Sequence, residues 1–115
     1  PVLNQIVPGA VDALCRLGDL CREDDRYLED QTIMLCASLV QPDGAGGYSL
    51  DRLRLQAQPL ALQRRVLREV FRRMHPIRRA SSLATVEAVR RLLSPHRGGA
   101  THSIGGVHIR VTEHA

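Results

Sequence analysis

The sequence predicts a mainly α-helical fold: a small helical domain with a long N-terminal amphipathic helix and a C-terminal β-hairpin. Three observations support this prediction. Apolar residues recur at helical spacing from residue 10 to about residue 40, without a proline. A second helical pattern starts at Pro59, and a Gly-Gly pair near the C-terminus separates two short β-prone runs. With 115 residues, the chain is long enough to bury one modest core.

Residues 1–40 are expected to form a long connecting helix with a break near Pro8. Its narrow apolar seam repeats every seventh residue, at Leu14, Cys21, Leu28 and Leu35. A helix of about 33 residues would be about 50 Å long, which exceeds the diameter of so small a domain. We therefore expect part of it to pack on another region of a longer protein, or on a second copy in a homodimer. The cysteines, odd in number, are expected to be free and buried.

Residues 41–115 are expected to form the helical domain. A glycine-rich loop covers residues 41–47, and Ser49 then caps a short helix from residue 50 to about residue 55. The next helix begins at Pro59 and ends at about Met74, since proline suits the first helical turn.

A further helix follows Ser81 or Ser82 as its cap and ends before Ser94 and Pro95. Its inward-facing residues are expected to be Leu83, Val86, Val89 and Leu93. The last segment, residues 101–112, alternates apolar and polar residues on either side of the Gly-Gly pair, which is typical of a β-hairpin.

The helix that starts at Pro59 has a polar face made almost entirely of arginine. Residues 59–80 hold seven Arg and one Glu, a charge of +6, whereas the rest of the chain holds nine Arg and eleven acidic residues, a charge of −2. At 100° per residue, the expected core-facing side is formed by Leu60, Val66, Leu67, Val70, Phe71 and Met74. The opposite side carries Arg64, Arg65, Arg68 and Arg72, with Arg73 at its flank. Such a face favours binding to phosphate, and an ordinary solvated surface is the alternative.

No pattern of catalytic residues is found, and no Cys, His and acidic residues stand at the spacing of a metal site. We therefore predict no catalytic, cofactor-binding or metal-binding residues in this chain. No apolar run approaches the roughly 18 residues that cross a membrane. We expect no signal peptide, because no basic segment followed by an apolar one stands at the start of the sequence. Because the first residue is Pro, we expect a piece of a longer, cytoplasmic protein.

The order of these segments resembles one region of the tRNA(Ile)-lysidine synthetase family, namely the region that follows the ATP-pyrophosphatase domain. The resemblance covers nearly the whole chain, including YSLDRL at residues 48–53 and VEAV at 86–89. Its most specific parts are PLALQRRVLRE at residues 59–69 and IGGVHIR at 104–110.

Enzymes of that family use ATP to adenylate the wobble cytidine of an isoleucine tRNA and then attach lysine to it. The resemblance implies that this chain is a noncatalytic module that binds tRNA(Ile), with the arginine face gripping its phosphates. It also implies that lysine and ATP, with Mg, bind in a preceding domain, since the family's ATP loop is absent from this chain.

Two other functions remain open. The first is a free-standing helical nucleic-acid-binding regulator with the Pro59 helix in the major groove of DNA, although the arginine face lacks the amide side chains that usually read bases. The second is a helical protein-interaction module, in which the apolar seam pairs with a partner helix.

Overall fold

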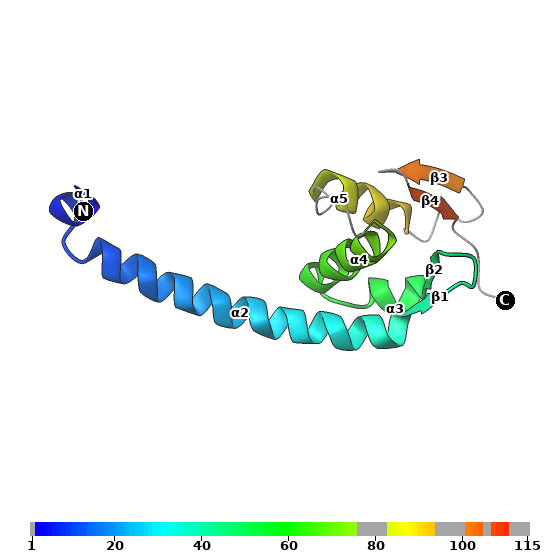
Figure 1. Cartoon of the computed structure of the whole chain (residues 1–115), viewed down its shortest axis with the longest axis horizontal. Helices are drawn as coiled ribbons and strands as arrows, with labels where there is room; N and C mark the ends of the chain where they lie inside the picture. Colours follow the sequence, from blue (N-terminus) through cyan, green and yellow to red (C-terminus); the bar gives the residue numbers. More distant parts are fainter. Residues whose placement is uncertain (1, 76–82, 94–100, 105–106, 111–115) are drawn as a thin grey trace. The chain divides into compact units, whose positions relative to one another are not determined.

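The computed structural model describes residues 2–75, 83–93, 101–104 and 107–110 (Figure 1). The chain divides into two compact units, residues 1–31 and residues 32–115. Its elements are, in order, α1 (Val2–Ile6), α2 (Ala10–Leu39), β1 (Val40–Pro42), β2 (Tyr48–Leu50), α3 (Arg52–Gln56), α4 (Leu60–Met74), α5 (Leu83–Leu92), β3 (Thr101–Ile104) and β4 (Val107–Arg110). The predicted fold class, mainly α with a long N-terminal helix and a C-terminal hairpin, is confirmed.

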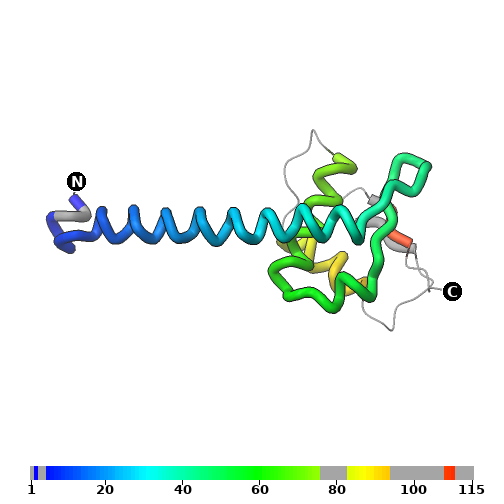
Figure 2. Tube along the Cα trace, turned by 90° about the horizontal axis from the view of Figure 1, so that it is seen from below, coloured from blue at the N-terminus to red at the C-terminus, as the bar shows by residue number. Residues whose placement is uncertain are grey.

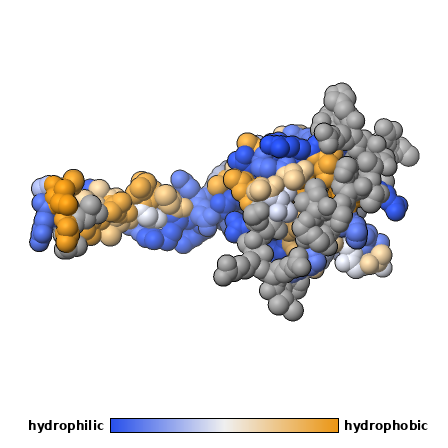
Figure 3. All heavy atoms as spheres, turned by 90° about the horizontal axis from the view of Figure 1, so that it is seen from above, coloured by the Kyte–Doolittle hydropathy of each residue, from blue (hydrophilic) through white to orange (hydrophobic). Residues whose placement is uncertain are grey.

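The predicted break near Pro8 separates α1 from α2, where Gly9 adopts a left-handed φ of 80°. From Ala10 to Leu39, α2 has no interruption, as the tube in Figure 2 shows. Large apolar side chains of α2 are exposed, namely Leu14, Leu17, Leu20, Tyr27, Ile33 and Met34. Figure 3 shows exposed apolar residues of the first unit, residues 1–31, as orange atoms on its surface.

The cysteine prediction is correct only for Cys36, which is buried, and wrong for Cys15 and Cys21, which are exposed. All three are free, as expected. The reason is the position of the buried part of α2, whose buried residues begin only at Thr32.

The second unit has an aliphatic core to which α2, β1, α3, α4 and α5 all contribute. The core consists of Cys36, Leu39, Val40, Leu55, Val66, Leu67, Phe71, Val86, Val89 and Leu93. Leu55 and Val66 are fully buried at its centre. Because Phe71 is the only phenylalanine in the chain and tryptophan is absent, burial of aliphatic side chains carries most of the stability of this unit.

Residues 43–47 form a loop, as predicted for residues 41–47, but Gln41 and Pro42 belong to a strand. The prediction that Ser49 caps a helix is wrong. Residues 40–42 pair with residues 48–50 in an antiparallel hairpin, in which Ser49 lies opposite Gln41. The carboxylate of Asp43 closes the turn by accepting hydrogen bonds from the backbone N–H groups of Ala45 (2.8 Å) and Gly47 (2.9 Å). These two hydrogen bonds lower the pKa of Asp43, and the bond from Ala45 has the larger effect.

Asp51, rather than Ser49, is the N-cap of α3: its side chain accepts a hydrogen bond from the backbone N–H of Arg54 at 3.2 Å. The helix therefore begins two residues later than predicted. The strand β2 takes up Ser49, so Asp51 is the first side chain that can reach the free N–H groups of the helix.

The predicted extent of α4 is confirmed, but its buried face differs at two positions, Leu60 and Leu62. Leu60, the first helical residue, is 43% exposed, whereas Leu62 is 9% exposed and shares the buried face with Val66, one turn later. On α5, Leu83 is likewise exposed, and Leu92 is buried beside the predicted Val86, Val89 and Leu93. The predicted cap and end of α5, at residues 81–82 and 94–95, lie outside the described residues.

The predicted C-terminal hairpin is confirmed in the part that the structure describes. Strands β3 and β4 pair antiparallel, with Thr101 opposite Arg110 and Ile104 opposite Val107. Ile109 packs against the core of the second unit. The Gly-Gly pair at residues 105–106 and the predicted last residues, 111–112, lie outside the described residues.

Candidate nucleic-acid interface

The candidate interface is built on α4, whose two faces are set by its sequence. Pro59, with φ −55°, precedes the first turn, and the backbone N–H of His75 bonds to the carbonyl of Phe71 at the end of the helix. One side of α4 is buried in the core, which leaves the arginine-rich side toward solvent. Arg72 and Arg73 in the last turn also interact favourably with the negative end of the helix dipole.

The five predicted arginines differ in exposure and in contacts. Arg68 and Arg72 are exposed, while Arg64 and Arg65 are partly buried. The side chain of Arg73 is 33% exposed, compared with 63% for Arg72. Across the described part of the chain, Arg68 makes no hydrogen bond or ion pair, so its guanidinium is available for an outside ligand.

Glu69 holds two of these arginines on the surface of α4. Its carboxylate accepts hydrogen bonds from Nε (2.8 Å) and Nη2 (2.6 Å) of Arg72, and one from Nε of Arg73 (3.2 Å). These hydrogen bonds lower the pKa of Glu69, and those from Arg72 have the largest effect. One negative charge is therefore shared between two positive ones.

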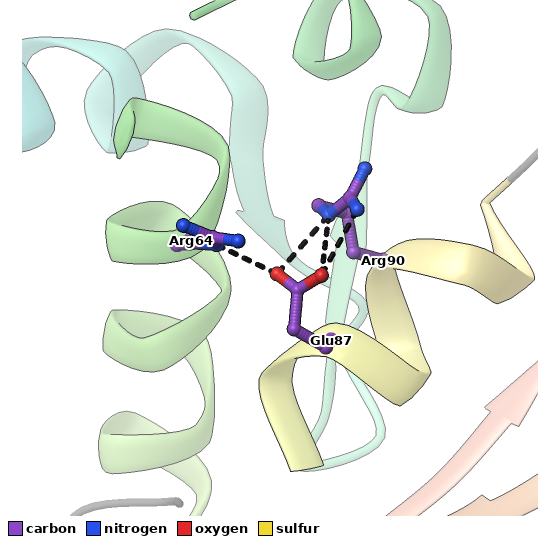
Figure 4. Close-up of polar contacts among 3 residues, drawn as sticks. All are labelled: Arg64, Glu87 and Arg90. Carbon is purple, nitrogen blue, oxygen red and sulfur yellow. Dashed lines mark hydrogen bonds and ion pairs between the residues drawn. The ribbon is translucent and has the colours of Figure 1, made fainter. Parts of the chain in front are cut away.

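Glu87 makes a second cluster, which joins α4 to α5 (Figure 4). Its Oε1 accepts a hydrogen bond from Nε of Arg64 at 2.7 Å. Arg90 donates from Nη2 to Oε2 at 2.9 Å and from Nε at 3.2 Å and 3.3 Å to the two carboxylate oxygens. These hydrogen bonds lower the pKa of Glu87 to about 2, and those from Arg90 have the largest effect. The carboxylate in turn raises the pKa of Arg90.

The sequence analysis did not include Glu87 and Arg90 among the site residues. The spacing of the two, three residues apart on one helix, is a visible signal for an ion pair. The contact with Arg64 has no comparable signal, because it depends on how α4 packs on α5.

The side-chain amide of Gln63 on α4 donates hydrogen bonds to backbone carbonyls of the chain itself. The side chain of Gln63 donates to the carbonyl of Gln58 at 2.8 Å and to that of Gln56 at 3.3 Å. Direct reading of base edges usually needs an amide or a similar mixed donor and acceptor beside arginine. The surface of α4 is therefore better suited to phosphates than to bases.

Two other kinds of site, a metal cluster and a membrane span, are not found in the residues that the structure describes. Within them, no three His, Cys, Asp or Glu side chains lie close enough together to bind a metal. None of the helices in this part of the chain combines the length and the apolar character that a membrane crossing requires.

A family model described as the TilS substrate binding domain matches residues 50–114, more than half of the chain. The chain belongs to this family. It is also 36% identical over 113 residues to the tRNA(Ile)-lysidine synthase of Thermosynechococcus vestitus. The aligned region covers 96% of this chain and 31% of that protein. The tRNA(Ile)-lysidine synthase of Leifsonia xyli subsp. xyli is 31% identical over 110 residues, which covers 95% of this chain and 32% of that protein. No solved structure matches significantly.

The resemblance to tRNA(Ile)-lysidine synthetases is thus confirmed, and the TilS substrate-binding domain contains the whole arginine surface. Helices α3, α4 and α5 lie within residues 50–114, as do both glutamate-centred clusters. The matches to the two synthases include residues before position 50 as well, since each covers at least 95% of the chain. The chain spans about a third of the length of these relatives.

Proposed function

We propose that this chain is the noncatalytic tRNA-binding module of a tRNA(Ile)-lysidine synthase. In this proposal, the whole enzyme is a cytoplasmic ligase that uses ATP to attach lysine to the wobble cytidine of tRNA(Ile). Lysine and ATP, with Mg, bind outside this chain. The observation that carries the proposal is the arginine surface of α4, which lies inside the region matched to a substrate-binding domain.

The module binds the tRNA through its phosphates. Guanidinium groups are planar donors that match the geometry of phosphate oxygens, and Arg68 makes no bond to any residue that the structure describes. Contacts of this kind fix the register and orientation of the RNA without reading its sequence. The shape of the folded tRNA therefore determines how it binds to this module, and selection of the cytidine occurs elsewhere in the enzyme.

A second candidate function, a DNA-binding regulator, is less well supported. A regulator that reads the major groove needs side chains that contact base edges, whereas the amide of Gln63 on α4 is bonded to the backbone. A competition between tRNA and DNA separates the two functions.

The test is fluorescence anisotropy of labelled tRNA(Ile) with the 115-residue chain over a series of salt concentrations. Duplex DNA of equal charge serves as the competitor. We expect preferential binding of tRNA, and a plot of log K against log salt with a slope of roughly −3, as about four phosphate contacts would give. Absence of binding at low salt, or equal competition by DNA, would contradict the proposal.

A further inference from the structure

We propose that Glu87 is a positioning residue for RNA: it holds Arg64 of α4 and Arg90 of α5 so that both present their remaining N–H donors to the phosphate backbone. Arg90 thereby belongs to the binding surface, together with the arginines of α4. The inference rests on the proposed function of the module and adds to it a role for two residues of α5.

Within the described residues, the hydrogen bonds to Glu87 leave other N–H donors of both arginines available. Arg64 uses only Nε on Glu87, so neither of its terminal nitrogens is taken up by the carboxylate. Arg90 uses Nε and Nη2, which leaves Nη1. Figure 4 shows the carboxylate between the two guanidinium groups, with one nitrogen of Arg90 directed away from it.

The environment of the cluster suits positioning better than simple neutralisation. The side chain of Glu87 is 17% exposed, whereas Arg64 and Arg90 are 40% and 31% exposed. The carboxylate is thus the most buried member and the guanidinium groups extend toward solvent. A long flexible side chain loses rotamer freedom when it binds a ligand, and prior ordering by Glu87 removes part of that loss.

The charge of Glu87 makes the proposal testable by the sign of one effect. Two guanidinium groups share a single carboxylate, so Glu87→Gln adds one positive charge to the surface. If Glu87 only neutralises charge, this variant binds tRNA more tightly. If Glu87 positions the arginines, the variant binds more weakly in spite of its added charge.

The experiment compares the tRNA affinity of the wild-type chain with that of Glu87→Gln. The matched control is Glu23→Gln, an identical chemical change at an exposed residue of α2. We expect Glu87→Gln to weaken binding at least about threefold and the control to bind as tightly as wild type or more tightly. Affinity of Glu87→Gln equal to or above that of the control would overturn the proposal.

A double-mutant cycle tests whether Glu87 acts through the two arginines. Adding Glu87→Gln to an Arg64→Gln/Arg90→Gln variant is expected to change tRNA affinity little, because the groups that Glu87 positions are gone. A loss as large as in the wild-type background would show that Glu87 acts by another route. Failure of the wild-type chain to bind tRNA would instead refute the proposed function, and this inference with it.

Circular dichroism and thermal melting report whether each variant is folded. Should Glu87→Gln fail to fold, Glu87→Asp provides the second variant, because it keeps the charge but shortens the reach to Arg64. We expect Glu87→Asp to bind tRNA more weakly than wild type. Unchanged binding by a folded Glu87→Asp chain would overturn the positioning role.

Discussion

Arg68→Gln is the sharpest single test of the tRNA-binding surface. Arg68 is exposed on α4 and has no ion pair within the described residues. Its replacement therefore breaks no internal contact, and glutamine is a good helix former, so the fold is expected to persist. Any loss of tRNA affinity then reports a contact with the RNA.

The expected magnitude follows from one lost phosphate contact. Each such contact adds roughly 0.7 to 0.9 to the salt slope, so at about 0.1 M salt the variant should bind roughly five- to eightfold more weakly than wild type. The two salt plots should converge as the salt concentration approaches about 1 M, because counterion release then contributes little.

Fluorescence anisotropy over a series of KCl concentrations measures both the affinity and the slope. The matched control is Arg22→Gln, which removes the same charge from α2, where Arg22 pairs with Asp19. The control should leave the slope unchanged. A wild-type slope in Arg68→Gln, or an equal change in the control, would refute the assignment of Arg68 as a phosphate contact.

Three further outcomes are expected. Because the pKa of Glu87 is lowered to about 2 from an ordinary 4.5, the folded state stays ionised where the unfolded chain takes up a proton. The free energy of unfolding should therefore fall as the pH drops from 4.5 toward about 2. Urea unfolding at several pH values should show this dependence and a weaker one in Glu87→Gln. Leu55→Ala, at a fully buried site, should lower the free energy of unfolding by about 2 to 5 kcal/mol in urea titrations. The exposed apolar residues of α2 should allow two copies to associate, and Leu17→Glu should shift the sedimentation of the chain toward monomer.

Helices α2 and α4 could be predicted because their signals are local. A repeat of apolar residues over many turns identifies each helix, and Pro8 and Pro59 mark positions near their starts. The first hairpin had no such signal: each of its strands has three residues, too few to show alternation. It depends instead on the carboxylate of Asp43, whose bonds to Ala45 and Gly47 become evident only once the turn is formed.

The arginines of α4 could be predicted from the sequence, but the contact between α4 and α5 could not. The arginines of α4 follow from its sequence, because the apolar residues of the helix determine which side faces the core. The contact of Arg64 with Glu87 spans twenty-three residues and depends on the packing of α5. In the sequence, the spacing of Glu87 and Arg90 indicates an ion pair within α5, but nothing indicates that Glu87 also contacts Arg64.

The two glutamates lower the net charge with which this surface meets the phosphates of the RNA. The proposed binding surface comprises six of the arginines of α4 and α5, with Glu69 and Glu87, which gives these eight residues a net charge of +4. The six are Arg64, Arg65, Arg68, Arg72, Arg73 and Arg90. If the carboxylates keep their arginines when RNA binds, the salt slope should reflect the net charge of +4, which corresponds to roughly 2.8 to 3.6. If the arginines leave the carboxylates for phosphate, the slope should rise to roughly 4.2 to 5.4, as six contacts would give. A slope in the lower range would mean that the surface binds tRNA with its ion pairs intact, as the positioning role of Glu87 requires.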